Sequence, residues 1–131
     1  MIGKRGLNAY QINQTSARAK VASPYRLVQI AFENLMDNLA KARGGIERGD
    51  AKVRGESLGK AMDVINILIS ALDHSVNPEI SGNLEKIYRH SNRCLLEVNR
   101  YDDLDKLDEV VAMLGKIKVT WDQLEARLNA P

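Results

Sequence analysis

Residues 61–72 read AMDVINILISAL, and only Asp63, Asn66 and Ser70 interrupt the apolar side chains. Residues three or four apart share one face of a helix, so a helix that packs on one side carries one apolar stripe. This segment carries two stripes. The first holds positions 58, 62, 65, 69 and 72, and the second holds positions 61, 64, 68 and 71. The first stripe predicts a core helix. The second is explained equally well by burial on most sides or by a groove for a partner.

The composition of the 131-residue chain is that of one soluble domain, with 44% hydrophobic and 27% charged residues. A net charge of +2 is too small to signal a nucleic-acid or membrane partner. The single cysteine, Cys94, excludes an intrachain disulfide framework. No apolar run approaches the roughly 18 residues of a membrane span, and no secretory signal follows Lys4 and Arg5. We therefore expect a cytoplasmic protein without membrane insertion.

Helix-start signals divide most of the chain into four periodic segments. Ser23-Pro24, Asp50 and Asn77-Pro78 each place a capping side chain ahead of a helix. The predicted helices cover about 24–48, 50–75, 78–99 and 102–129. Because short links make neighbouring helices antiparallel, the predicted fold is an all-α, up-down-up-down four-helix bundle over residues 23–131.

Residues 1–22 differ from the rest because they contain four basic residues and no acid. A helical regulator that binds nucleic acid through this arm is one interpretation. Four charges are weak support for it, and we predict no nucleic-acid partner. We expect an N-terminal cap or arm that lays one or two side chains on the bundle.

The residues needed for catalysis or metal binding do not assemble in the sequence. His74 and His90 fall in different predicted helices, and neither has a partner constellation. His90 and Cys94 are spaced to share a helix face, but two ligands do not complete a metal site. We expect Cys94 to be buried and His90 to lie at the surface. The chain is predicted not to be an enzyme, with no catalytic residue, metal or cofactor.

Landmarks along nearly the whole chain follow the order found in one protein family. They are Ala9-Tyr10, Val21-Ala22-Ser23-Pro24, Leu27-Val28, Lys60-Ala61, Ile65, Leu68, Leu72-Asp73, Asn83-Leu84, Tyr88, Leu95, Glu97, Asn99 and Trp121. In these residues the chain resembles the FliS family of flagellar secretion chaperones. It departs from the family pattern at Ala31-Phe32-Glu33-Asn34 and at Val76-Asn77-Pro78, neither of which removes a bundle position.

The resemblance implies an export chaperone of the bacterial cytoplasm that binds the disordered C-terminal segment of flagellin in hydrophobic surface grooves. Binding would prevent premature polymerisation and aid type III flagellar export, with a flagellar export-gate component as a further partner. The resemblance also implies that the N-terminal segment covers part of the groove. Leu7 and Tyr10 stand at the matching positions.

The second stripe and the resemblance together predict the partner-binding residues. These are Leu7, Tyr10, Ala61, Val64, Ile67, Leu68, Leu84, Tyr88 and Leu95. In the third helix two choices stay open, Leu84 with Tyr88 or Leu95. Tyr88 is explained equally well as a half-buried core tyrosine with its hydroxyl in water. The alternative function is a homodimeric helical-bundle interaction protein without an export client, closed through the second stripe.

Overall fold

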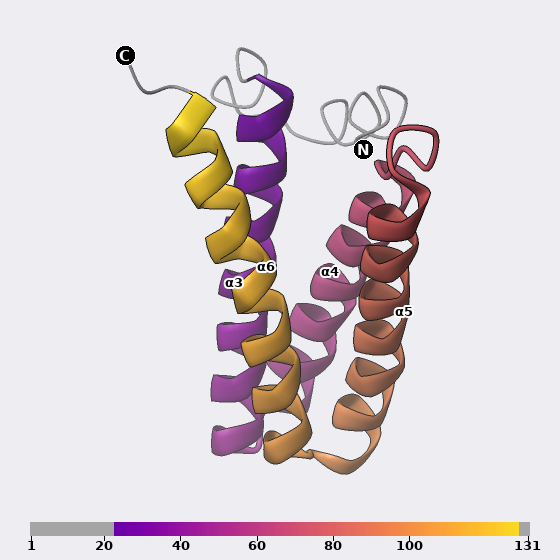
Figure 1. The fold of residues 1–131 in the computed structure, drawn as a ribbon. Coiled ribbons are helices and arrows are strands. Elements are labelled where there is room, and N and C mark those ends of the chain that lie inside the picture. Colours follow the sequence, from indigo (N-terminus) through magenta and orange to yellow (C-terminus); the bar gives the residue numbers. More distant parts are fainter. Residues whose placement is uncertain (1–22, 129–131) are drawn as a thin grey trace.

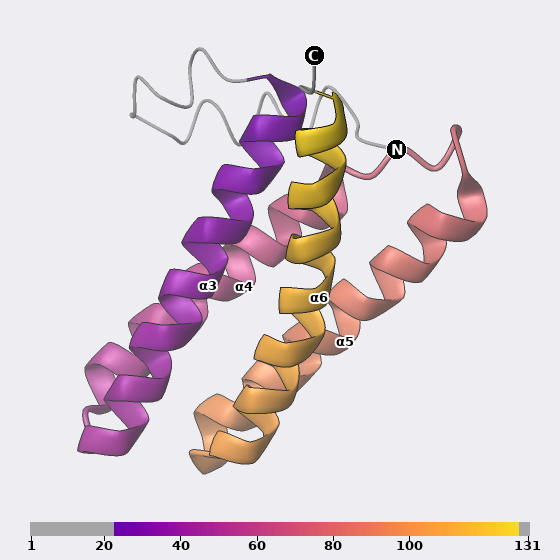
Figure 2. The same ribbon diagram turned by 60° about the vertical axis from the view of Figure 1, so that its left-hand side comes forward.

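A computed structural model gives the structure of the protein; it describes residues 23–128, and side chains from 23 to 123. Its helices are α3 (Pro24–Arg48), α4 (Ala51–Ser70), α5 (Pro78–Tyr101) and α6 (Leu104–Leu128). They run alternately up and down (Figure 1), and α3 and α5 each pack against both α4 and α6. Figure 2 shows the bundle from the side of α6, with α3 and α5 on either side of it. The prediction of an all-α, up-down-up-down four-helix bundle is confirmed.

The predicted capping residues occupy their helix starts. The Ser23 hydroxyl accepts a hydrogen bond of 3.2 Å from the Arg26 amide, and Pro24 follows as the first helical residue. The carboxylate of Asp50 accepts one of 3.1 Å from the Val53 amide. Gly49 ends α3 with a φ of 68°, a left-handed conformation that an L side chain adopts only with strain. Together Gly49 and Asp50 reverse the chain within two residues.

The turn between α5 and α6 is built from a pair of aspartates. Asp102 ends α5 in the left-handed region, with a φ of 53°. Asp103 then accepts a hydrogen bond of 3.0 Å from the amide of Lys106 in the first turn of α6. Asp and Asn tolerate such conformations because their short side chains bond to nearby backbone. The predicted restart of the helix at these aspartates therefore has a direct local cause.

Helix α4 ends at Ser70, earlier than the expected end near Ser75. The amide of Leu72 bonds to the carbonyl oxygen of Ile69 at 3.2 Å, a tightening typical of a last turn. The carboxylate of Asp73 then accepts a hydrogen bond of 3.0 Å from the amide of Ser75. This side-chain bond competes with the helical one, so the chain leaves the helix there.

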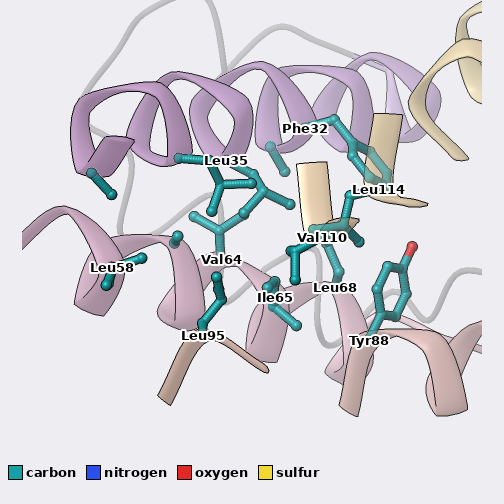
Figure 3. Close-up of a cluster of buried hydrophobic side chains, with 14 of the residues drawn as sticks. Phe32, Leu35, Leu58, Val64, Ile65, Leu68, Tyr88, Leu95, Val110 and Leu114 are labelled. Atoms are coloured by element: carbon teal, nitrogen blue, oxygen red, sulfur yellow. The ribbon is translucent and has the colours of Figure 1, made fainter. Parts of the chain in front are cut away.

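The second apolar stripe is fully buried, whereas the first is buried at Leu58 and Ile65 and half-buried at Met62, Ile69 and Leu72. Leu58 and Ile65 of the first stripe are 1% and 0% exposed, and Ala61 and Leu68 of the second are 0% and 4% exposed. The helix packs against α3 on one side and α5 on the other, so two faces are covered within the bundle. Figure 3 shows side chains of both stripes in one cluster with side chains of the other helices. The structure thus favours the first explanation of the second stripe, burial on most sides.

Candidate functional site: an apolar pocket at one end of the bundle

The antiparallel order brings the starts of α3 and α5 to the same end as the final parts of α4 and α6 (Figure 1). Apolar side chains from all four helices surround a small pocket there, which we call the end pocket. It is lined by Val28, Leu68, Ala71, Leu72, Leu84, Tyr88, Ile117 and Trp121.

The size of the end pocket restricts what it can hold. It encloses about 30 Å³, whereas pockets for small-molecule ligands are on the order of 300 to 1,000 Å³. Its buried floor consists of Val28, Leu68, Ala71 and Tyr88. Its half-buried rim consists of Leu72, Leu84, Ile117 and Trp121. The pocket suits the tip of one apolar side chain, and its rim suits further apolar contacts.

One wall of the end pocket is held by contacts between α6 and α3. The indole Nε1 of Trp121 donates a 2.8 Å hydrogen bond to the backbone carbonyl oxygen of Tyr25. The two rings lie with centroids 5.3 Å apart. One turn further along α3, Gln29 donates a 2.8 Å hydrogen bond to Asp122, which also pairs with Lys118 at 2.6 Å. These contacts fix the orientation of Trp121 at the rim.

The link between α4 and α5 is held to the first turns of α5 by contacts of His74. The Nδ1 of His74 lies 2.7 Å from the hydroxyl of Ser81, and its Nε2 lies 3.1 Å from a carboxylate oxygen of Glu85. A hydrogen bond from Arg89 is the largest cause that lowers the pKa of Glu85, and this favours its charged form. Ser81 has 0% exposure, so its hydroxyl faces the protein interior, and the row of serine, histidine and glutamate ties the link to α5.

The structure separates the predicted site residues into two groups and leaves two undescribed. Leu68, Leu84 and Tyr88 come together in the end pocket. Ala61, Val64 and Leu95 are 0%, 7% and 0% exposed in the core, and Ile67 is partly buried against it. Leu7 and Tyr10 lie outside the described residues. Binding by Ala61, Val64 and Leu95 stays a prediction, because it requires the bundle to open.

Several pocket residues were not among the predicted site residues. They are Val28, Ala71, Leu72, Ile117 and Trp121. All belong to ordinary helix seams in the sequence, and only the packing of the four helix ends shows that they meet. A large aromatic residue near the end of the last helix, Trp121, was the one local signal.

Tyr88 is more deeply buried than a half-buried core tyrosine. It is 4% exposed, and its ring lies 6.5 Å from that of Phe32, centroid to centroid. Burial raises the pKa of its hydroxyl well above the ordinary value. Tyr88 therefore stays neutral at physiological pH and contributes an apolar ring to the floor of the pocket.

Cys94 and His90 lie as the sequence predicts, buried and exposed respectively. The Cys94 sulfur is 3.5 Å from Nε2 of His90, and burial raises the pKa of the thiol, which favours its uncharged form. Within the part of the chain that the structure describes, no three His, Cys, Asp or Glu side chains group as metal ligands. No helix in that part is both long enough and apolar enough to span a membrane.

Comparison with known proteins gives consistent matches along the chain. The model of the family described as "Flagellar protein FliS" matches residues 6–128. The flagellar secretion chaperone FliSB of Pseudomonas aeruginosa is 35% identical over 122 residues, which cover 93% of this chain and 97% of the relative. The flagellar secretion chaperone FliS of Salmonella typhimurium is 32% identical over 125 residues, which cover 95% of this chain and 93% of the relative. The flagellar secretion chaperone FliS of Bacillus subtilis is 26% identical over 115 residues, which cover 88% of this chain and 82% of the relative.

Proposed function

Since this chain belongs to the FliS family of flagellar secretion chaperones, we propose that its client is the disordered C-terminal segment of flagellin. Binding takes place in the bacterial cytoplasm and keeps flagellin from polymerising before type III export. A flagellar export-gate component is the further partner to which the complex is delivered. The protein acts by binding alone, without catalysis.

The end pocket is the observation that carries this proposal. A disordered segment that orders on binding gains affinity from apolar side chains spread along its length. The pocket accepts one such side chain, and the half-buried rim residues, among them Leu72 and Leu84, surround it with apolar surface. We assign the rim the first contacts with the client. Contacts with Ala61, Val64 and Leu95 would follow only if the bundle opened.

The N-terminal segment is proposed to cover the end pocket when the client is absent. Leu7 and Tyr10 precede Ser23, which caps the helix that supplies Val28 to the pocket floor. An extended chain spans about 3.3 Å per residue, so either side chain can reach the rim from Ser23. The client and the N-terminal segment would then compete for the same apolar surface.

A homodimer is the alternative, and it loses its main support. It was inferred from the second stripe of α4, whose residues Ala61 and Leu68 are buried inside one bundle. Dimerisation through that stripe would require the helices to separate. Analytical ultracentrifugation of the protein, alone and with the flagellin segment, separates the two. A monomer that binds the segment fits the chaperone proposal, and a stable dimer that does not bind it revives the alternative.

The direct test is calorimetric titration with the C-terminal segment of flagellin from the same organism. The expected result is a one-to-one complex with a negative heat-capacity change, the marker of apolar burial. The control is the same segment with its apolar residues changed to serine. Absence of heat, with separate elution in gel filtration, would overturn the proposal.

A further inference from the structure

The solvent face of α5 carries a stripe of positive charge. Lys86, Arg89, Arg93 and Arg100 recur at helical spacing on this face, and all are exposed. From Lys86 to Leu96 the sequence contains no acid. Arg89 pairs with Glu85 at 3.0 Å, but Lys86 and Arg93 have no ion-pair partner among the described residues. Lys86, Arg93 and Arg100 therefore present positive charge that no ion pair among the described residues neutralises.

An exposed leucine interrupts this stripe. Leu96 is 58% exposed, and it follows Arg93 by three residues and precedes Arg100 by four, so it lies among the arginines on one face. Single exposed apolar residues are common on protein surfaces. Here Arg93 and Arg100 flank the leucine on one side and Asn92 and Asn99 on the other, which is the pattern of an apolar anchor with a polar rim.

The neighbouring surface of α4 has no side chains at two positions. Two hydrogen bonds join the helices: Asn92 to Asn66 at 2.9 Å, and Arg54 to Asn99 at 3.0 Å. Gly59 lies between the two bonded positions of α4, and Leu96 lies between the two of α5. A Cβ atom added at Gly59, or at Gly55 one turn away, would meet no described residue within 4 Å.

No contact with the described residues requires glycine at these two positions. Each glycine in a helix interior costs about 1 kcal/mol relative to alanine, and the open space would admit alanine without a clash. The missing side chains do, however, leave α4 flat at about the level of Leu96, so that another backbone can approach closely.

We propose that this α4/α5 face, made of Gly55, Gly59, Arg89, Arg93, Leu96 and Arg100, docks an acidic amphipathic helix of another protein. Acidic side chains on the partner pair with the arginines, and an apolar side chain packs on Leu96 over the two glycines. The apolar centre and the balanced total charge favour a protein over nucleic acid, which needs an extended basic surface. None of these residues lines the end pocket, so the docking face and the client site are separate.

The test uses a synthetic 21-residue peptide with leucine along one helical face and glutamate elsewhere, labelled with fluorescein. Its matched control carries lysine in place of glutamate. Fluorescence anisotropy at low salt should show binding of the acidic peptide and not of the lysine peptide, with affinity falling as salt screens the charges. Failure of the acidic peptide to bind, or equal binding of both peptides, overturns the proposal.

Variants locate the site. The double change Arg93→Glu with Arg100→Glu should weaken peptide binding by about tenfold or more, and Leu96→Ser and Gly59→Gln should each weaken it. The control Lys41→Glu with Lys116→Glu reverses the same number of exposed charges on α3 and α6. If this control loses as much peptide affinity as the arginine variant, binding depends on the total charge of the protein. That result would contradict binding at a defined face. Circular dichroism checks that each variant is folded.

Trp121 distinguishes this site from the client site. It is the only tryptophan of the chain and lines the end pocket. Peptide bound at the α4/α5 face should leave its emission unchanged. A shift in that emission by the acidic peptide would place the peptide in the end pocket and refute the assignment of the face, whatever the outcome for flagellin.

Discussion

The indole of Trp121 and the backbone carbonyl of Tyr25 are joined by a 2.8 Å hydrogen bond that connects the last helix to the first turn of α3. The bond spans 96 positions in the chain, so it closes the bundle at the end where the pocket lies. It also leaves the apolar part of the indole at the pocket rim. The same contact therefore serves stability and the shape of the candidate site.

Trp121→Phe should lower both stability and affinity for the flagellin segment. Loss of the hydrogen bond and of part of the ring should cost about 1 to 3 kcal/mol of unfolding free energy, measured by urea denaturation with circular dichroism. Tyr25→Phe is the matched control, because it keeps the backbone carbonyl and an aromatic ring. A larger loss of stability in that control than in Trp121→Phe would mean that the tyrosine hydroxyl, and not the indole bond, closes this end.

Substitutions in the floor and the rim of the end pocket should have different consequences. Leu68, 4% exposed, belongs to the floor, so Leu68→Ala should cost about 2 to 5 kcal/mol of stability. Leu72→Ser at the half-buried rim should cost less than about 1.5 kcal/mol yet weaken binding of the flagellin segment in calorimetry. Unchanged affinity in a folded Leu72→Ser protein would remove the rim from the client site.

The contact between His74 and Ser81 should appear as a coupling energy. The Oγ atom of Ser81 and the Nδ1 atom of His74 are 2.7 Å apart, and Ser81 is fully buried. A double-mutant cycle with His74→Ala and Ser81→Ala should give a coupling of about 0.5 to 1.5 kcal/mol, the usual range for one hydrogen bond. Additive effects of the two changes would show that His74 does not hold the link between α4 and α5.

Stability at alkaline pH should depend on Tyr88. Burial raises the pKa of its hydroxyl from the ordinary value of 10.0, so above that pH the unfolded chain releases this proton more readily than the folded one. The contribution of the Tyr88 hydroxyl to the free energy of unfolding is fully present below pH 10. It is lost as the pH rises above that value, and the free energy then falls by up to about 1.4 kcal/mol per pH unit. Tyr88→Phe should remove this part of the slope in urea denaturation between pH 9 and about pH 11.5. Identical slopes in both proteins would contradict the burial of the hydroxyl.

Two glycine-to-alanine changes should shift stability in opposite directions. Gly49 has a φ of 68°, so Gly49→Ala should destabilise the protein by about 1 kcal/mol. Gly55 lies within α4 with open space around it, so Gly55→Ala should stabilise the protein by up to about 1 kcal/mol. Thermal unfolding of the two variants measures both effects, and a destabilised Gly55→Ala protein would show that this glycine has a packing role inside the bundle.

Local signals in the sequence predicted the helices well. Ser23, Asp50 and Asn77 bond to the amides of their own first turns, so a few neighbouring residues determine each start. The end of α4 was predicted less well, because the bond from Ser75 to Asp73 competes with a helical pattern that continues past Ser70. Whether the side-chain bond or the helix prevails depends on the packing of the link.

The candidate site could be predicted only in part. Leu68, Leu84 and Tyr88 were named, but Ala61 and Leu95 had the same periodicity and lie in the core. Periodicity shows that a helix has two apolar faces, but it does not show which neighbour covers each face. The rim residues Ile117 and Leu72 are far apart in the chain, so no spacing in the sequence connects them.

The sequence by itself determined the four helices, their caps and their antiparallel order, because these follow from backbone hydrogen bonds and from apolar spacing within short segments. Only the tertiary structure decided which apolar faces remain accessible. Gly45 illustrates the reason: a Cβ there would lie 2.8 Å from the backbone nitrogen of Arg54, so only glycine allows α3 and α4 to approach this closely. Close approach of two helices, like the meeting of four helix ends around one pocket, depends on contacts between residues distant in the chain, and local pattern does not encode those contacts.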